Sequence, residues 1–191
     1  VKIIRSPLIP RGKGLGFKLI LNYVSFCLWS TFLAPIKIKG KFDRIFIYQL
    51  SPIFASLPAI LLRFLKKAPS IIWVTDLWPE SLVATGAVTN ARVLGLVRRI
   101  VRFIYQQCDR ILVQSKGFIG SVEAFGIPPE RISYFPNWAE AVYTPLVLPA
   151  EAPERQELPH GFSVMFAGNL GAAQDFETIL TAAEELRADP T

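Results

Sequence analysis

Short apolar runs alternate with longer helical patterns over the first 136 residues of the chain. Four runs rich in β-branched and aromatic residues are typical of buried strands, at residues 43–49, 70–75, 110–114 and 132–135. Helices are expected between them, at residues 52–67, from Pro79 onward, 92–107 and 115–126. A further short strand is expected at residues 2–5. This alternation predicts an α/β fold with a doubly wound parallel sheet.

Residues 17–34 form a predicted helix that is apolar on nearly every side. Only Lys18, Asn22 and Ser25 share a narrow polar stripe. Such a helix is buried in protein or in lipid, so a core helix and an interfacial membrane helix both fit. A transmembrane span needs about 20 apolar residues, which this segment barely provides. Lysines follow at once, and they suit anionic headgroups: Lys37, Lys39 and Lys41.

The clearest amphipathic helix covers residues 92–107. One face is apolar and the other is basic, the latter formed by Arg92, Arg98, Arg99 and Arg102. Two interpretations of the basic face stay open, a solvated surface and a membrane contact.

A change of composition divides the chain near residue 140. Residues 140–160 hold four prolines and four glutamates, which predicts an extended linker. Beyond it, residues 162–167 are expected to form a strand, 168–171 a turn and 175–187 a helix. We therefore expect a first domain at 1–139, a linker at 140–160 and the start of a second α/β domain at 161–191. The initial Val and the unclosed second unit suggest a fragment.

Charge follows the same division. The net charge of +6 combines 18 Lys and Arg against four Asp and Glu in residues 1–120 with three against 11 in residues 121–191. The first part, with a balance of +14, therefore favours an anionic partner, which is a membrane surface, a phosphorylated substrate or nucleic acid. The two cysteines show no metal-ligand spacing, which favours a reducing compartment.

The strand at 70–75 leads directly into candidate chemistry. Asp76, Trp78 and Glu80 follow its carboxyl end, where an open α/β sheet places its ligands. A carboxylate there can act as a general base or bind hydroxyls, and Trp78 can stack on a sugar. The alternative is that Asp76 caps the next helix and Glu80 complements its dipole. We favour function for Asp76, because a cap does not require the neighbouring Trp and Pro.

Polar residues also follow other strands. Ser115 and Asn137 end two of them, although an N-cap and a turn explain these residues equally simply. The turn at 168–171 and Gln174 lie between a strand and a helix, where backbone N–H groups can contact a phosphate. A plain turn is the alternative there.

Several ordered motifs together resemble glycosyltransferase family 4, and most closely its WbuB-like bacterial sugar transferases of O-antigen and capsule synthesis. The motifs are Asp-Leu-Trp-Pro-Glu-Ser at 76–81, Ile-Tyr at 104–105, Asp-Arg-Ile-Leu-Val-Gln-Ser at 109–115, Pro-Asn-Trp at 136–138 and Phe-Ala-Gly-Asn-Leu-Gly at 166–171. The resemblance implies a GT-B fold of two Rossmann-like domains, of which 1–139 would be the acceptor side without its N-terminal strand. It also implies transfer with retention from a nucleotide sugar to a lipid-linked acceptor, without metal or cofactor.

From the residues themselves we expect catalytic roles for Asp76 and Glu80 and acceptor binding by Trp78, Ser115 and Asn137. Many relatives carry a His near the strand end where this chain has Asp76. The resemblance adds donor contacts and a location. Donor diphosphate contacts fall on Gly168, Asn169, Gly171 and Gln174. Many relatives carry a basic residue where this chain has Asn169. A hexosyl or N-acetylhexosaminyl transferase, peripheral on the anionic inner face of the cell membrane and facing the cytoplasm, is expected, with the 191 residues inactive by themselves.

A non-catalytic, basic membrane- or nucleic-acid-binding module is the alternative. Nucleic acid is not expected as a partner, because the aromatic residues lie inside apolar runs rather than among Lys and Arg.

Overall fold

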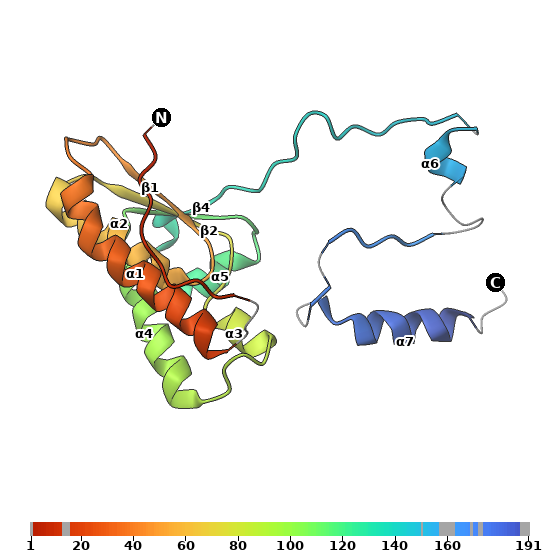
Figure 1. Ribbon diagram of the computed structural model, residues 1–191, viewed down its shortest axis with the longest axis horizontal. Helices are drawn as coiled ribbons and strands as arrows, with labels where there is room; N and C mark the ends of the chain where they lie inside the picture. The colour runs from red at the N-terminus through yellow and green to blue at the C-terminus, as the bar shows by residue number, and fades with distance from the viewer. Residues whose placement is uncertain are drawn as a thin grey trace. The chain divides into compact units, whose positions relative to one another are not determined.

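The computed structural model describes residues 2–12, 16–149, 151–156, 163–168, 170–171 and 174–187 (Figure 1). The chain divides into two compact units, Val1–Asn137 and Trp138–Thr191.

The first unit is built on a four-stranded parallel sheet. Its strands are β1 (Ile45–Gln49), β2 (Ser70–Val74), β3 (Arg110–Val113) and β4 (Ile132–Tyr134). They lie in the order β1-β2-β3-β4, and every neighbouring pair is parallel. The predicted α/β class and parallel sheet are therefore confirmed.

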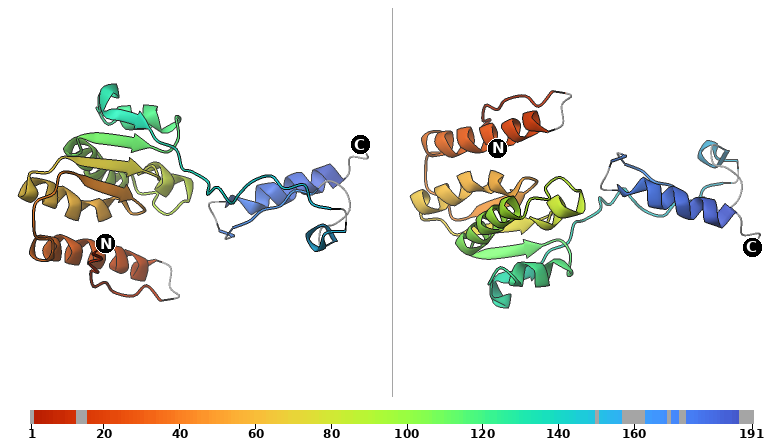
Figure 2. Two further views of the ribbon diagram at one scale, coloured as in Figure 1. Left: turned by 90° about the horizontal axis from the view of Figure 1, so that it is seen from above. Right: turned by 90° about the horizontal axis from the view of Figure 1, so that it is seen from below.

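Helices connect successive strands and lie on one face of the sheet. The connecting elements are η1 (Ile53–Ser56), α2 (Leu57–Lys66), α3 (Glu80–Ala84), α4 (Ala91–Gln107), α5 (Phe118–Glu123) and η2 (Pro129–Arg131). Because strand order advances in one direction, right-handed crossovers place the connecting helices on the same side. Figure 2 shows this: one view meets the strands first, and the opposite view meets α2 and α4 first.

The core lies between the sheet and these helices. Ile72, Val74 and Ile111 point to it from the central strands and are fully buried. From α4, Ile104 and Tyr105 pack onto them, also with no exposed surface. Alternate residues of each strand face this core, as the period of a strand requires.

On the opposite face of the sheet, the apolar side chains of the edge strand β1 are open to solvent. Phe46 and Tyr48, on β1, are 54% and 53% exposed. The Tyr48 ring lies 5.2 Å from that of Trp73 on the same face. Parallel sheets are usually covered on both faces, so this exposure is unusual. β1 pairs only with β2, which leaves its outer edge without a strand neighbour among residues 16–149.

The predicted apolar helix is present as α1 (Phe17–Lys37), which packs against α2 and η1. Residues 2–12 run beside it (Figure 1). The predicted strand at 2–5 is wrong, because this segment has no strand neighbour and lies along a helix instead.

The second unit contains α6 (Pro153–Gln156) and α7 (Phe176–Arg187). The latter confirms the helix predicted at 175–187. Residues 138–149, on the other hand, contain no regular element beyond a turn. The strand predicted at 162–167 is wrong over its described part, 163–167, where no backbone partner completes a ladder and Val164 and Met165 are exposed. A strand requires such a partner, and the local pattern of Phe, Val and Met does not supply one.

Candidate functional site

Two loops meet at the carboxyl ends of β1 and β2 and bring three side chains together. Ser51 follows β1, while Asp76 and Trp78 follow β2. The Ser51 hydroxyl donates to Asp76 Oδ2. The Trp78 indole N–H lies 3.1 Å from Ser51 Oγ and 3.2 Å from Asp76 Oδ2. One carboxylate oxygen is thus held by donors from both loops, which fixes the direction of the group.

The indole that holds Asp76 is itself fixed by the core. Trp78 is 7% exposed and meets the Phe54 ring edge-on at a centroid distance of 6.2 Å. The alternative role of Asp76 as a helix cap is not observed, since the N-cap of α3 is Pro79 and no side chain caps it. Among the described residues, no donor reaches Asp76 Oδ1. That oxygen is free to accept a hydroxyl from a ligand.

A chain of polar contacts continues across the ends of the remaining strands. Thr75 Oγ1 donates to the Gln49 carbonyl at 2.6 Å. Gln114 Nε2 donates to the Thr75 carbonyl at 2.6 Å, and Asn137 Nδ2 donates to Gln114 Oε1 at 2.6 Å. These contacts tie the ends of all four strands together. We call Ser51, Asp76, Trp78, Gln114 and Asn137 the rim.

Glu80 and Ser115, two further predicted site residues, make no hydrogen bond or ion pair with the rim within the part of the chain that the structure describes. Glu80 is exposed in the first turn of α3, where its charge complements the helix dipole. The Ser115 hydroxyl accepts from the Gly117 N–H at 3.2 Å in the turn before α5, whose N-cap is Gly117, so the alternative capping role of Ser115 is not observed. Beneath the rim, Tyr105 is fully buried, and its hydroxyl has no hydrogen-bond partner within residues 16–149. Burial raises the pKa of Tyr105, and the negative charges of Glu80 and Asp76 add to the shift.

An open, mainly apolar pocket of about 340 Å³ reaches the rim. Tyr23 and Phe26 of α1 form one wall. Ile47 and Ser51 line the other. The pocket therefore connects the side of α1 with the hydroxyl that holds Asp76.

The predicted donor residues lie in the second unit. Gly168 and Gly171 precede α7, and the Gln174 N–H donates to the Gly171 carbonyl at 3.1 Å. A Cβ atom on Gly171 would lie 3.1 Å from Gln174 Oε1, so the glycine leaves room for that amide. Asn169 lies outside the described residues. The predicted role of this turn in binding a diphosphate stays a prediction.

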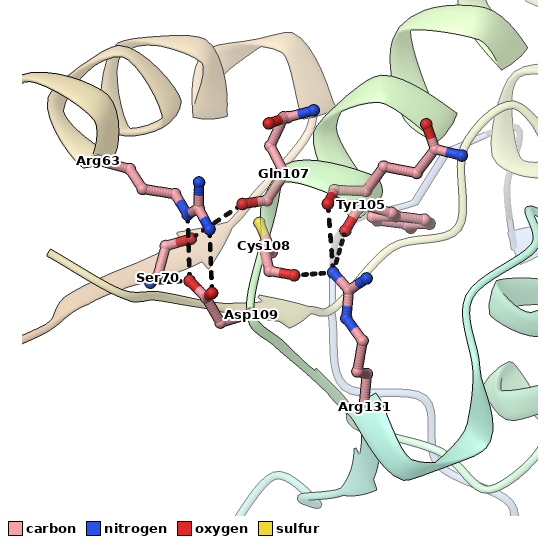
Figure 3. Close-up of polar contacts among 8 residues, drawn as sticks. Arg63, Ser70, Tyr105, Gln107, Cys108, Asp109 and Arg131 are labelled. Atoms are coloured by element: carbon pink, nitrogen blue, oxygen red, sulfur yellow. Dashed lines mark hydrogen bonds and ion pairs between the residues drawn. The ribbon is translucent and has the colours of Figure 1, made fainter. Parts of the chain in front are cut away.

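A second polar cluster lies at the opposite, amino ends of the strands (Figure 3). Arg63 Nε and Nη2 contact the two Asp109 carboxylate oxygens at 3.1 and 2.9 Å, and the Ser70 N–H donates to the same group at 2.8 Å. Arg63 and the Ser70 N–H hold the pKa of Asp109 down at about 2, against the opposing effect of burial. Arg131 donates to the backbone carbonyls of Tyr105 and Cys108. Each charge meets its partner within the protein, which marks the cluster as structural.

Ser51 and Gln114 belong to the rim although neither was predicted as a site residue. Ser51 precedes a proline and is typical of a turn, and Gln114 merely ends a strand. Their contacts join residues 25 and 39 positions apart, which no local pattern reveals. The one available signal was that each directly follows an apolar strand, at the edge where ligands bind.

Comparison with known proteins identifies related chains. The model of the glycosyl transferase 4-like domain matches residues 1–138. WcaI of Escherichia coli (strain K12), whose name describes a colanic acid biosynthesis glycosyl transferase, is 24% identical over 193 residues, covering 97% of this chain and 47% of WcaI. WbjE of Pseudomonas aeruginosa, whose name describes a glycosyltransferase, is 27% identical over 162 residues, covering 81% of this chain and 40% of WbjE. The chain spans less than half the length of either relative.

Proposed function

Because the chain belongs to the glycosyl transferase 4-like family, we propose that it forms the acceptor side of an enzyme that transfers sugar from a nucleotide sugar to a lipid-linked acceptor. The reaction takes place in surface polysaccharide synthesis, a proposal supported by the name of WcaI, which places that relative in colanic acid biosynthesis. The enzyme works at the cytoplasmic face of the cell membrane. The sugar is a hexose or N-acetylhexosamine, and its anomeric configuration is retained.

The observation that carries the proposal is the directed carboxylate of Asp76. Ser51 and Trp78 hold Oδ2, and Oδ1 accepts the hydroxyl of the incoming acceptor. A carboxylate in this arrangement orients the nucleophilic oxygen and takes up its proton as the new glycosidic bond forms. In the same step the bond from the anomeric carbon to the donor diphosphate breaks on the same face of the sugar, and the nucleoside diphosphate leaves with the electron pair. Trp78 serves mainly to position Asp76, because its ring is buried in the core.

The remaining rim residues supply polar groups for the acceptor sugar. Asn137 is exposed, and its side-chain carbonyl accepts no hydrogen bond among the described residues. Glu80 and Ser115 lie at the starts of α3 and of the turn before α5, near the same edge of the sheet. Gly168, Asn169, Gly171 and Gln174 contact the donor diphosphate through backbone and amide N–H groups, without metal.

The test is a transfer assay with the protein produced from its intact gene. A panel of radiolabelled nucleotide hexoses and N-acetylhexosamines is offered with a polyprenyl diphosphate-linked sugar. We expect one donor to label the lipid fraction and NMR of the product to show the anomer of the donor. The 191 residues alone should be inactive, because donor and acceptor must be positioned together. Absence of transfer from every donor would favour the non-catalytic binding module instead.

A further inference from the structure

The outer side of α1 carries a continuous stripe of exposed apolar residues. Each is about half exposed or more, and together with Val24, which is 40% exposed, they follow the helix at intervals of mostly three or four positions. We define this outer stripe as Phe17, Ile20, Leu28, Trp29, Phe32 and Ile36. Phe17, Leu28 and Phe32 reach 72%, 65% and 67% exposure. An apolar surface of this extent on one helix marks an interaction site.

The charge around the stripe has a single sign. The first 42 residues contain eight Lys and Arg and no Asp or Glu. Lys18 is exposed at the start of α1, while Lys37, Lys39 and Lys41 are exposed at and beyond its end. An apolar stripe with cations at both ends complements an anionic bilayer, whose acyl chains and headgroups it matches.

The inner side of α1 is attached to the rest of the unit. Asn22 Nδ2 donates to the Ile9 carbonyl at 2.6 Å, and Ser25 Oγ accepts from the Ile9 N–H at 2.9 Å. Cys27 Sγ lies 3.3 Å from the Phe54 carbonyl, and the Tyr23 ring packs edge-on against Phe54. A helix that crosses a bilayer would lose these contacts, because lipid would surround it.

We propose that α1 lies flat in the interface of an anionic membrane, with the outer stripe among the acyl chains and the lysines among the headgroups. The sequence leaves three alternatives open for this helix, which are a core helix, an interfacial membrane helix and a transmembrane span. Only the interfacial helix explains both the exposed apolar outer side and the attached inner side. The significance for transfer rests on the proposed function: the pocket on the inner side of the membrane-bound α1 reaches Ser51, whose hydroxyl holds Asp76. Membrane binding itself needs neither sugar nor catalysis.

Vesicle sedimentation of the 191-residue chain tests the proposal. We expect binding to vesicles of phosphatidylcholine with phosphatidylglycerol and little binding to phosphatidylcholine alone. Each lysine near the surface strengthens binding about fivefold, so Lys37→Gln, Lys39→Gln and Lys41→Gln together should weaken it on the order of 100-fold. Leu28→Ser with Phe32→Ser should also release the protein. Phe64→Ser, at an exposed position of α2 outside the stripe, is the matched control and should bind normally.

Two further measurements separate the other outcomes. Brominated lipids should quench the fluorescence of Trp29, which is identified as the part of the emission that is lost in Trp29→Phe. Washing with alkaline carbonate should release the bound chain from the vesicles. Resistance to carbonate would show a spanning helix and overturn the proposal. A dimer in solution that Leu28→Ser with Phe32→Ser dissolves, without vesicle binding, would show that a second copy covers the stripe and would overturn it equally. Vesicle binding is measured without any sugar. If the proposed transferase function is wrong, the binding result still stands.

Discussion

At the scale of single residues, the rim fixes the orientation of the Asp76 carboxylate. Its Oδ2 accepts from a hydroxyl and from an indole N–H that come from different loops. An amide oxygen can accept from the same donors, so Asn in this position keeps the shape of the loop. What it loses is the negative charge and the capacity to take up a proton.

We therefore expect Asp76→Asn to lower turnover of the enzyme by about 10²–10⁴-fold with an unchanged melting temperature. The measurement is sugar transfer by the product of the intact gene. Asp43→Asn, in an exposed loop before β1, is the matched control and should keep normal activity. A mutant with near wild-type turnover would show that Asp76 has no chemical role.

Asp109 offers the contrasting case of a structural carboxylate. Its pKa is lowered to about 2, so its contribution to stability is complete above about pH 4, its unfolded value, and disappears as the pH falls toward 2. Since the Asp109 side chain is 40% exposed, solvent screens the pair, and Asp109→Asn should cost about 1 kcal/mol at neutral pH. Thermal unfolding should show the two proteins converging below about pH 3. A constant difference across this range would contradict the assignment.

Local sequence identified Asp76 and Trp78 but only part of their surroundings. An acidic residue and a Trp that directly follow an apolar strand predict a ligand site, because ligands bind at the carboxyl ends of strands. Ser51 and Gln114 have none by themselves, because their importance arises only when the parallel register brings β1 beside β2 and β2 beside β3. Ser115 shows the limit of a local signal, since its hydroxyl accepts from the Gly117 N–H in a turn and does not cap α5.

At the scale of elements, α4 shows how fully a helix can be predicted when its signals agree. Its apolar face supplies Val101, Ile104 and Tyr105 to the core. Asn90 begins it, and its side chain accepts from the N–H groups of Arg92 at 2.9 Å and Val93 at 3.3 Å. Both signals lie within the helix and its first turn, so the sequence alone contains them.

Removal of this cap has a defined cost. Asn90→Ala leaves two N–H groups without their partner and should lower the free energy of unfolding by about 1 kcal/mol. Asn90→Asp keeps the acceptor and should retain wild-type stability. Urea denaturation of the two variants beside the wild type provides the comparison, and equal midpoints for Ala and Asp would show that the cap contributes nothing.

The two predicted strands that fail have one physical cause. Residues 2–5 and 162–167 have the apolar, β-branched composition of strands, as does β1. β1 becomes a strand because β2 pairs with it along its whole length. The described parts of the other two segments have no such neighbour. Composition therefore indicates the capacity to form a strand, and tertiary pairing decides whether one forms.

At the scale of the whole molecule, the division near residue 138 should be visible to proteases. Soon after this boundary, Tyr143, Leu146 and Val147 are 76%, 75% and 98% exposed. Chymotrypsin should therefore cut there first and release a resistant product that ends near residue 143. Mass spectrometry of a time course measures this. First cuts within β2 or α4 instead would show that the first unit is not independently stable.

The open edge of β1 has a consequence for handling the protein. Its sequence, Ile-Phe-Ile-Tyr-Gln, contains no charge and no proline, its outer edge has no strand neighbour within residues 16–149, and Phe46 and Tyr48 on one face are half exposed. Such an edge is a template on which another extended chain can add by backbone pairing. Concentrated solutions of these 191 residues should accordingly seed fibrils, and seeding should begin at β1.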